Sequence, residues 1–184
     1  LLRAQLALPY VETFSIMFAT YYLMKDRFLK VVPLILIFCV FCAQMSITQT
    51  FYYTDMYKND FEIDISKQIV HDLKEKGIYE QSTIIILGYL EPPFNSTCIT
   101  GEIVGASSYN SNYAAYPYYV YSTANILGVW QCLGYTYYTG STEQAEKARR
   151  VNEEEKMPIW PEEGSIKKCD DFYIIKLSED DLPW

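Results

Sequence analysis

The sequence has a single histidine, His71, among its 184 residues. One imidazole cannot supply a multi-histidine metal site, and a histidine-based catalytic triad is hard to build on a residue that lies among charged neighbours. The chain also lacks the G-x-S-x-G, P-loop and G-x-G-x-x-G motifs, which mark serine hydrolases and nucleotide-binding proteins. Asp55, Asp60 and Glu91 lie where a carboxylate could bind a metal ion or act as a base. A chain with 23 acidic residues places carboxylates at such positions by chance. The motifs therefore indicate no catalytic residue, no metal ligand and no particular cofactor.

Positive charge is scarce beyond the first part of the chain. Residues 1–51 contain four basic and two acidic residues, whereas residues 52–184 contain 11 basic and 21 acidic residues. Such an acidic region has no basic stripe to neutralise phosphates, which argues against nucleic acid as a partner. The change in charge coincides with a change in hydropathy, a pattern typical of a membrane segment joined to a soluble domain. The chain begins at Leu1 inside an apolar stretch, and we expect it to be the C-terminal piece of a longer protein.

Two apolar stretches lie in the first 51 residues. Val31–Thr50 has no charged residue and reaches the length of roughly 20 residues that a helix needs to cross a bilayer. We therefore predict a transmembrane helix there. Leu6–Met24 contains Pro9 and Glu12 near one end, and we interpret it as a second span with Glu12 near the interface or against other helices. The alternative is that these stretches are buried helices of a soluble protein.

The connection between the two stretches contains Lys25, Arg27 and Lys30. The positive-inside rule places such a connection in the cytoplasm, which puts residues 52–184 outside the membrane. We therefore expect an extracytoplasmic domain. In that oxidising setting a Cys98–Cys132 disulfide and free thiols are both open alternatives.

Residues 52–184 predict a small α/β domain with a short sheet. Ile65, Ile69 and Leu73 recur at helical spacing, and Gly77 marks the end of that helix. The sequence STIIILGYL follows directly. Because it is apolar on both faces, it is typical of a strand covered by helices. A helix leading into such a strand favours an α/β arrangement.

Three further elements follow towards the C-terminus. ANILGVWQCLG predicts a short helix that stops at Gly134. The segment from Ser141 to Lys156 predicts a polar surface helix, with Ser141 as the N-cap and Gln144 at the capping-box position. SIKKCDDFYIIKLS predicts a hairpin that turns at Asp170-Asp171.

Aromatic residues provide the candidates for substrate binding. Nine of the 18 tyrosines lie in residues 107–140; they either form a loop that buries its ring faces or contact carbohydrate or lipid headgroups. The segment MPIWPEEGSI, residues 157–166, places Trp160 between two prolines that cannot continue a helix. Trp160 either anchors this crossover by packing or lines a binding site. The candidate substrate-binding residues are Trp130, Tyr135 and Trp160.

The order of these segments resembles the C-terminal part of the bacterial type II glucosyltransferase family. The resemblance covers nearly the whole chain and runs through LLRAQLALPY, YYTDMYKNDFEIDISKQIVHDL, IIILGYL, the later LGY, MPIWPEEGSI and FYIIKL. It implies a multi-span membrane enzyme that moves a hexose, expected to be glucose, from a polyprenyl-phosphate carrier to a cell-surface glycan. The implied partners are the polyprenyl-phosphate-linked sugar, the surface glycan acceptor and the lipid bilayer, and the implied location is the bacterial plasma membrane with the C-terminal domain extracytoplasmic.

The same resemblance limits what this chain contributes. The catalytic carboxylate of such enzymes is expected in an early extracytoplasmic loop, outside the sequence given. This chain would supply the last spans and an acceptor-side domain. The alternative is a non-catalytic, membrane-anchored binding or assembly module of the cell envelope.

Overall fold

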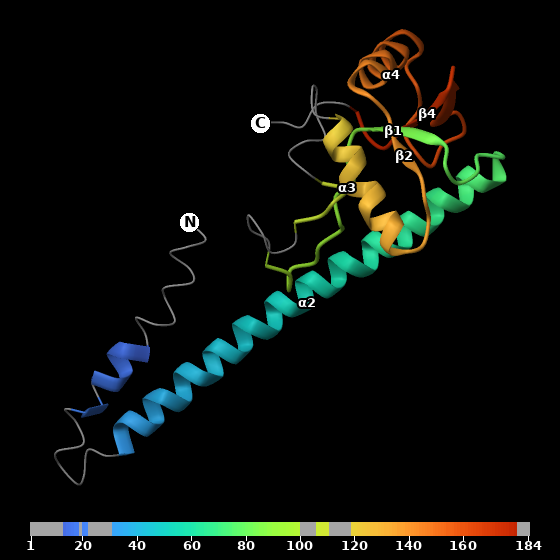
Figure 1. Cartoon of the computed structure of the whole chain (residues 1–184). Helices are drawn as coiled ribbons and strands as arrows, with labels where there is room; N and C mark the ends of the chain where they lie inside the picture. Colours follow the sequence, from blue (N-terminus) through green and yellow to red (C-terminus); the bar gives the residue numbers. More distant parts are fainter. Residues whose placement is uncertain (1–12, 19, 22–30, 100–105, 111–118, 180–184) are drawn as a thin grey trace. The chain divides into compact units, whose positions relative to one another are not determined.

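A computed structural model describes residues 13–18, 20–21, 31–99, 106–110 and 119–179 (Figure 1). The chain divides into two compact units, Leu1–Thr50 and Phe51–Trp184. In the first unit, residues 13–18 are helical. The rest of the expected span Leu6–Met24 lies outside the described residues, apart from residues 20 and 21, as do Lys25, Arg27 and Lys30.

The longest element is the helix α2, Val31–Glu75, with 45 residues. The sequence predicted a span ending near Thr50 and a separate amphipathic helix, whereas the structure joins them in one helix. The reason is local: no glycine or proline occurs between Leu34 and Lys76, so nothing interrupts the backbone hydrogen bonds. Gly77, with φ of 73°, follows the end of the helix, as predicted.

Among the described helices, α2 alone is long and apolar enough to cross a membrane, and the apolar window that meets this criterion has no buried residue. A signal sequence can meet the same criterion, so the helix by itself is weak evidence of membrane association.

The second unit contains a four-stranded mixed sheet in the order β2-β1-β4-β3. Its strands are β1 (Thr83–Leu87), β2 (Tyr138–Thr139), β3 (Ile166–Cys169) and β4 (Phe172–Lys176). β1 is parallel to both β2 and β4, whereas β3 and β4 form the predicted antiparallel hairpin. A long apolar helix followed by a small α/β domain with a short sheet is thus confirmed.

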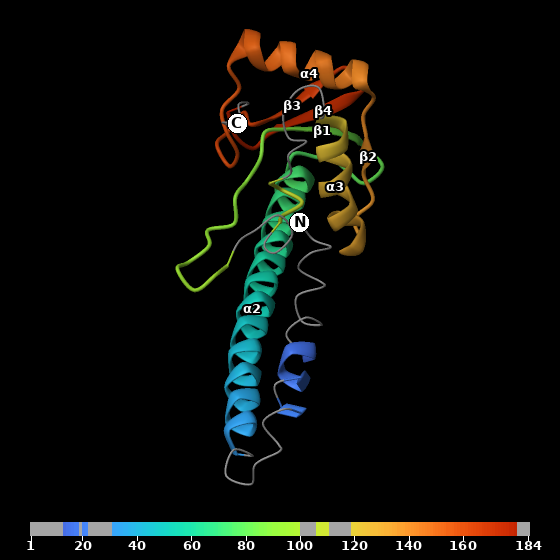
Figure 2. The same ribbon diagram turned by 90° about the vertical axis from the view of Figure 1, so that its left-hand side faces the viewer.

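Helices cover both faces of the sheet (Figure 2). Ile84 and Ile86 of β1 join a core with the C-terminal part of α2 and with α3, Tyr119–Cys132. Ile85 and Leu87 point to the other face and pack with α4, Thr142–Glu155. Successive strand residues face opposite sides, so a run of four consecutive apolar residues serves two cores.

Helix α3 begins five residues earlier than the sequence predicted, at Tyr119 instead of Ala124. Residues 119–123 lie in the tyrosine-rich stretch for which a loop was one alternative, and the loop alternative is wrong for them because they are helical. Thr123 connects this part of the helix to the sheet, because its Oγ1 accepts a hydrogen bond from Ile86 N at 3.0 Å. The partner strand β2 has two residues, so Thr123 satisfies a strand N–H that β2 is too short to reach.

Two predictions about local chemistry have clear outcomes. The capping box at the start of α4 is confirmed, because Ser141 Oγ accepts from Gln144 N and the Gln144 side chain accepts from Ser141 N. All five cysteines are free, so the structure contains free thiols at Cys98 and Cys132 and not the disulfide that was weighed as an alternative.

Candidate functional site

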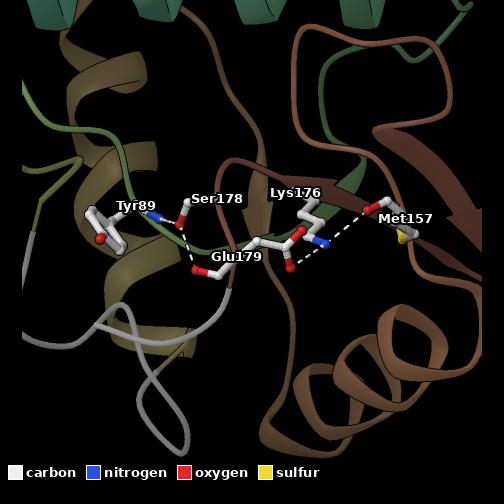
Figure 3. Close-up of polar contacts among 5 residues, drawn as sticks. All are labelled: Tyr89, Met157, Lys176, Ser178 and Glu179. Carbon is white, nitrogen blue, oxygen red and sulfur yellow. Dashed lines mark hydrogen bonds and ion pairs between the residues drawn. The ribbon is translucent and has the colours of Figure 1, made fainter. Parts of the chain in front are cut away.

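The segment after α4 is held by Lys176, the last residue of β4. Its side chain is 3% exposed, and its Nζ donates to Met157 O at 2.8 Å and to Glu179 Oε2 at 3.1 Å (Figure 3). Its backbone N–H donates to Ser165 O at 3.0 Å, and its carbonyl accepts from Trp160 N at 2.8 Å. Lys176 therefore fixes residues 157–165 at their beginning, middle and end.

A buried ammonium is costly unless it is hydrogen-bonded. The Met157 carbonyl and the Glu179 carboxylate supply two acceptors, which explains how a lysine can end an otherwise apolar strand. The loop adds its own turns: Glu162 N donates to Ile159 O at 2.9 Å and Ser165 N to Glu162 O at 3.2 Å. The loop is therefore a well-positioned support for the side chains that it carries.

The loop places Trp160 beside α2. Trp160 Nε1 donates to Asp72 Oδ2 at 2.8 Å, and the tryptophan is 9% exposed. The two residues border an open cleft of about 250 Å³, lined by Asp72, Glu75, Lys76, Trp160, Pro161, Glu162, Glu163, Ser165 and Ile166. The lining contains four carboxylates, one ammonium group and one indole. Carboxylates accept hydrogen bonds from hydroxyl groups, so a hydroxyl-rich ligand matches this chemistry.

The crevice between the carboxyl ends of the parallel strands β1 and β4 is filled by the chain itself. Open α/β sheets usually bind ligands at such a crevice. Here Ser178 Oγ accepts from Tyr89 N at 2.9 Å and donates to the Glu179 carbonyl at 3.1 Å (Figure 3). A Cβ on Gly88 would lie 2.5 Å from Ser178 Oγ and 2.6 Å from Ser178 N, so only glycine fits.

A second polar cluster lies inside the core, where α2 and α3 approach residues 107–109. Tyr109 is fully buried; its hydroxyl accepts from Trp130 Nε1 at 2.8 Å and shares a hydrogen bond of 2.8 Å with Ser66 Oγ. Burial raises the pKa of Tyr109 to about 12, against smaller lowering effects of these two hydrogen bonds. Glu62 accepts from Ser107 Oγ at 2.8 Å and from Ser108 N at 2.6 Å.

This cluster contains residues that sequence reasoning missed. Glu62 and Ser66 are 6% and 0% exposed, although polar residues of an amphipathic helix are normally assigned to the solvent side. Their positions offered a signal, because residues 62, 66, 69 and 73 form one stripe at helical spacing. Ser107 and Tyr109 gave no comparable signal, since their partners on α2 lie more than 40 residues away in the sequence.

The three candidate substrate-binding residues lie in different surroundings. Trp160 lines the cleft described above. Trp130 is fully buried and meets Tyr137 edge-on, with 5.4 Å between ring centroids. Tyr135 is half-buried, and Lys74 Nζ lies 4.9 Å from its ring centroid. The structure does not bring them together in one cleft.

Within the described residues there is no group of three or more His, Cys, Asp or Glu side chains that could hold a metal ion. The structure thus defines a class: a membrane-length apolar helix that continues into a small mixed α/β domain. Comparison with known protein families, with curated proteins and with solved structures finds no match for the chain.

Proposed function

We propose that this chain is the C-terminal, membrane-proximal part of a glycosyltransferase that moves a hexose, in particular glucose, from a polyprenyl-phosphate carrier to a cell-surface glycan. The ordered resemblance of its segments to type II glucosyltransferases suggests the reaction. The structural observation that carries the membrane part of the proposal is the apolar surface of α2. In its N-terminal half Ile35, Phe38 and Phe41 are 56%, 67% and 59% exposed.

Exposure of that surface to water is unfavourable, which supports the proposed span. Exposed apolar area costs about 25 cal/mol per Å², and contiguous patches of this kind mark membrane or partner surfaces. A bilayer removes the cost along the whole apolar length. The basic residues Lys25, Arg27 and Lys30 precede α2 and favour a cytoplasmic start for the span, with the α/β domain outside.

In this proposal the α/β domain acts on the acceptor side, and the Trp160 cleft is its contact with the glycan. The indole offers an apolar edge, while Asp72, Glu162 and Glu163 accept hydrogen bonds from sugar hydroxyls. The catalytic carboxylate is assigned to a part of the enzyme outside this chain.

The proposal is tested by deleting the gene and analysing the sugar content of the surface glycan. We expect one hexose to be lost and then restored by a plasmid copy of the complete gene. In the same assay Glu163→Gln, in the cleft, should lower transfer at limiting acceptor, whereas Glu154→Gln, exposed on α4, should not. A glycan whose sugar content is unchanged by the deletion would refute the proposal.

A non-catalytic, membrane-anchored binding or assembly module is the second candidate. The observation that favours it is the crevice between β1 and β4, which Ser178 closes at the place where α/β sheets usually bind their ligands. If the chain is such a module, deleting the gene should remove an envelope complex from mild detergent extracts, whereas hexose transfer should continue.

A further inference from the structure

A loop of the α/β domain lies along α2 at the end of its uncharged stretch. Tyr57 Oη donates to Pro93 O at 3.0 Å, Asn95 Nδ2 donates to Tyr53 Oη at 3.2 Å, and Ile99 N donates to Thr54 Oγ1 at 3.0 Å. The rings of Tyr57 and Phe94 lie 6.2 Å apart. Three hydrogen bonds and a ring contact thus fix residues 93–99 against one segment of helix.

The loop and the helix together form a surface that we call the aromatic collar; it consists of Phe51, Tyr52, Tyr53, Met56, Tyr57, Phe94 and Ile99. Much of it faces outward: Tyr52 is 73% exposed, Met56 47% and Ile99 44%. Exposed apolar and aromatic side chains that lie together mark a surface that contacts a membrane, a protein or a ligand.

The length of α2 identifies that partner. Residues 31–54 of the helix contain no charged side chain; at 1.5 Å per residue they extend about 36 Å. The hydrocarbon core of a bilayer is about 30 Å thick and the headgroup regions add several ångströms on each side. The end of the uncharged stretch, where the collar lies, therefore coincides with the headgroup layer. The first charges beyond it are Asp55 and Lys58, which form an ion pair at 3.8 Å.

We propose that the aromatic collar rests in the headgroup layer of the bilayer and that the loop 93–99 is a second point of membrane contact beside α2. Tyrosines suit this layer because the ring is apolar and the hydroxyl is polar. The inference rests on the proposed span, but not on the glycosyltransferase activity. Its consequence is that the membrane holds the domain at two points.

The test uses tryptophan fluorescence of the full chain, reconstituted in phosphatidylcholine–phosphatidylglycerol vesicles with and without lipids brominated near the headgroup end of the acyl chain. Phe94→Trp and Ile99→Trp place reporters on the collar. Tyr79→Trp is the matched control, because Tyr79 is 71% exposed and follows α2 at its other end. Emission from Trp130, Trp160 and Trp184 is subtracted with the unsubstituted chain.

We expect brominated lipids to remove emission from both collar reporters and to leave the Tyr79→Trp reporter unchanged. If the chain floats with the vesicles after alkaline extraction and neither collar reporter loses emission, the collar inference is wrong and the span stands. If the chain does not float, both are wrong. If the collar emission changes with protein concentration and not with bromine, a second copy covers the collar and the inference is overturned.

Discussion

The two halves of α2 use the same kind of residue in opposite ways. In the N-terminal half, apolar side chains such as Ile35 and Phe38 are exposed. Towards its C-terminal end, Ile69 and Leu73 are 0% exposed because they pack under the sheet. One continuous helix therefore has two kinds of surface: the second half finds its apolar surroundings in the protein, whereas in our proposal the first half finds them in lipid.

The largest effect is expected at Trp160, which joins the C-terminal half of α2 to the loop 157–165. Replacing Trp160 by alanine should lower the free energy of unfolding of the α/β domain by ~3–5 kcal/mol, because it removes a buried indole and leaves Asp72 without its donor. Urea unfolding measures the loss, with Tyr79→Ala as an exposed control. A stable Trp160→Ala variant that no longer uses its acceptor would show that Trp160 is a binding residue and not a packing residue.

A core truncation compares the two halves directly. Leu73→Ala should lower the unfolding free energy of the domain by ~2–5 kcal/mol, because it leaves a cavity beneath the sheet. Ile37→Ala, at a side chain that is 40% exposed, should leave the same unfolding curve unchanged. Equal losses in the two variants would contradict the division of α2 into a packed half and an unpacked half.

A charge inserted into each half gives the complementary test. Phe38→Arg should disfavour membrane insertion by ~2.5–3.5 kcal/mol, since an arginine near the centre of a span must reach water. Gln68→Arg, at an exposed position of the packed half, should have no effect on insertion. The distribution between membrane and supernatant after alkaline extraction provides the measurement. A Phe38→Arg chain that inserts as well as the unsubstituted chain would count against the span.

The smallest effect concerns the buried hydroxyl of Tyr109 on the packed half. Tyr109→Phe should cost ~1–3 kcal/mol near pH 7, because Ser66 and Trp130 lose a shared partner.

The raised pKa of Tyr109 adds a pH dependence. The unfolded chain releases this proton near pH 10 and the folded chain near pH 12. The contribution of Tyr109 is therefore fully present below pH 10 and is lost as pH rises towards 12, by about 1.4 kcal/mol per unit at most. The difference in unfolding free energy between the unsubstituted chain and Tyr109→Phe should shrink over this range. A difference that stays constant from pH 9 to 12 would contradict the buried, protonated state.

Local signals predicted the elements whose determinants are close in sequence. The Ser141–Gln144 capping box, the strand around Ile84–Leu87 and the turn at Asp170-Asp171 each depend on neighbouring residues, and each prediction was confirmed. The continuity of α2 was also readable in principle, because it follows from the absence of glycine and proline. The change in hydropathy near Thr50 was taken as the end of a helix, and for this reason the single long helix was not predicted.

Contacts between distant residues were not predictable in the same way. The two-residue strand β2 exists because Tyr138 N donates to Ser82 O and Gly140 N to Ile84 O, and neither donor has a strand pattern of its own. Lys176 lies within the strand predicted for FYIIKL, but nothing in the sequence indicated that its buried side chain holds the loop around Trp160. Trp160 was therefore a foreseeable member of the candidate site, whereas Asp72 and Lys176 were not.

Thiol labelling of the unsubstituted chain tests the central claim most directly. Cys39 and Cys42 are exposed on the apolar half of α2, and Cys132 is exposed in the α/β domain. A membrane-impermeant maleimide applied to intact cells should modify Cys132 and leave Cys39 and Cys42 unmodified until detergent is added, as read by peptide mass spectrometry. If Cys39 and Cys42 react as fast as Cys132 without detergent, the apolar half of α2 lies in water and the account is wrong.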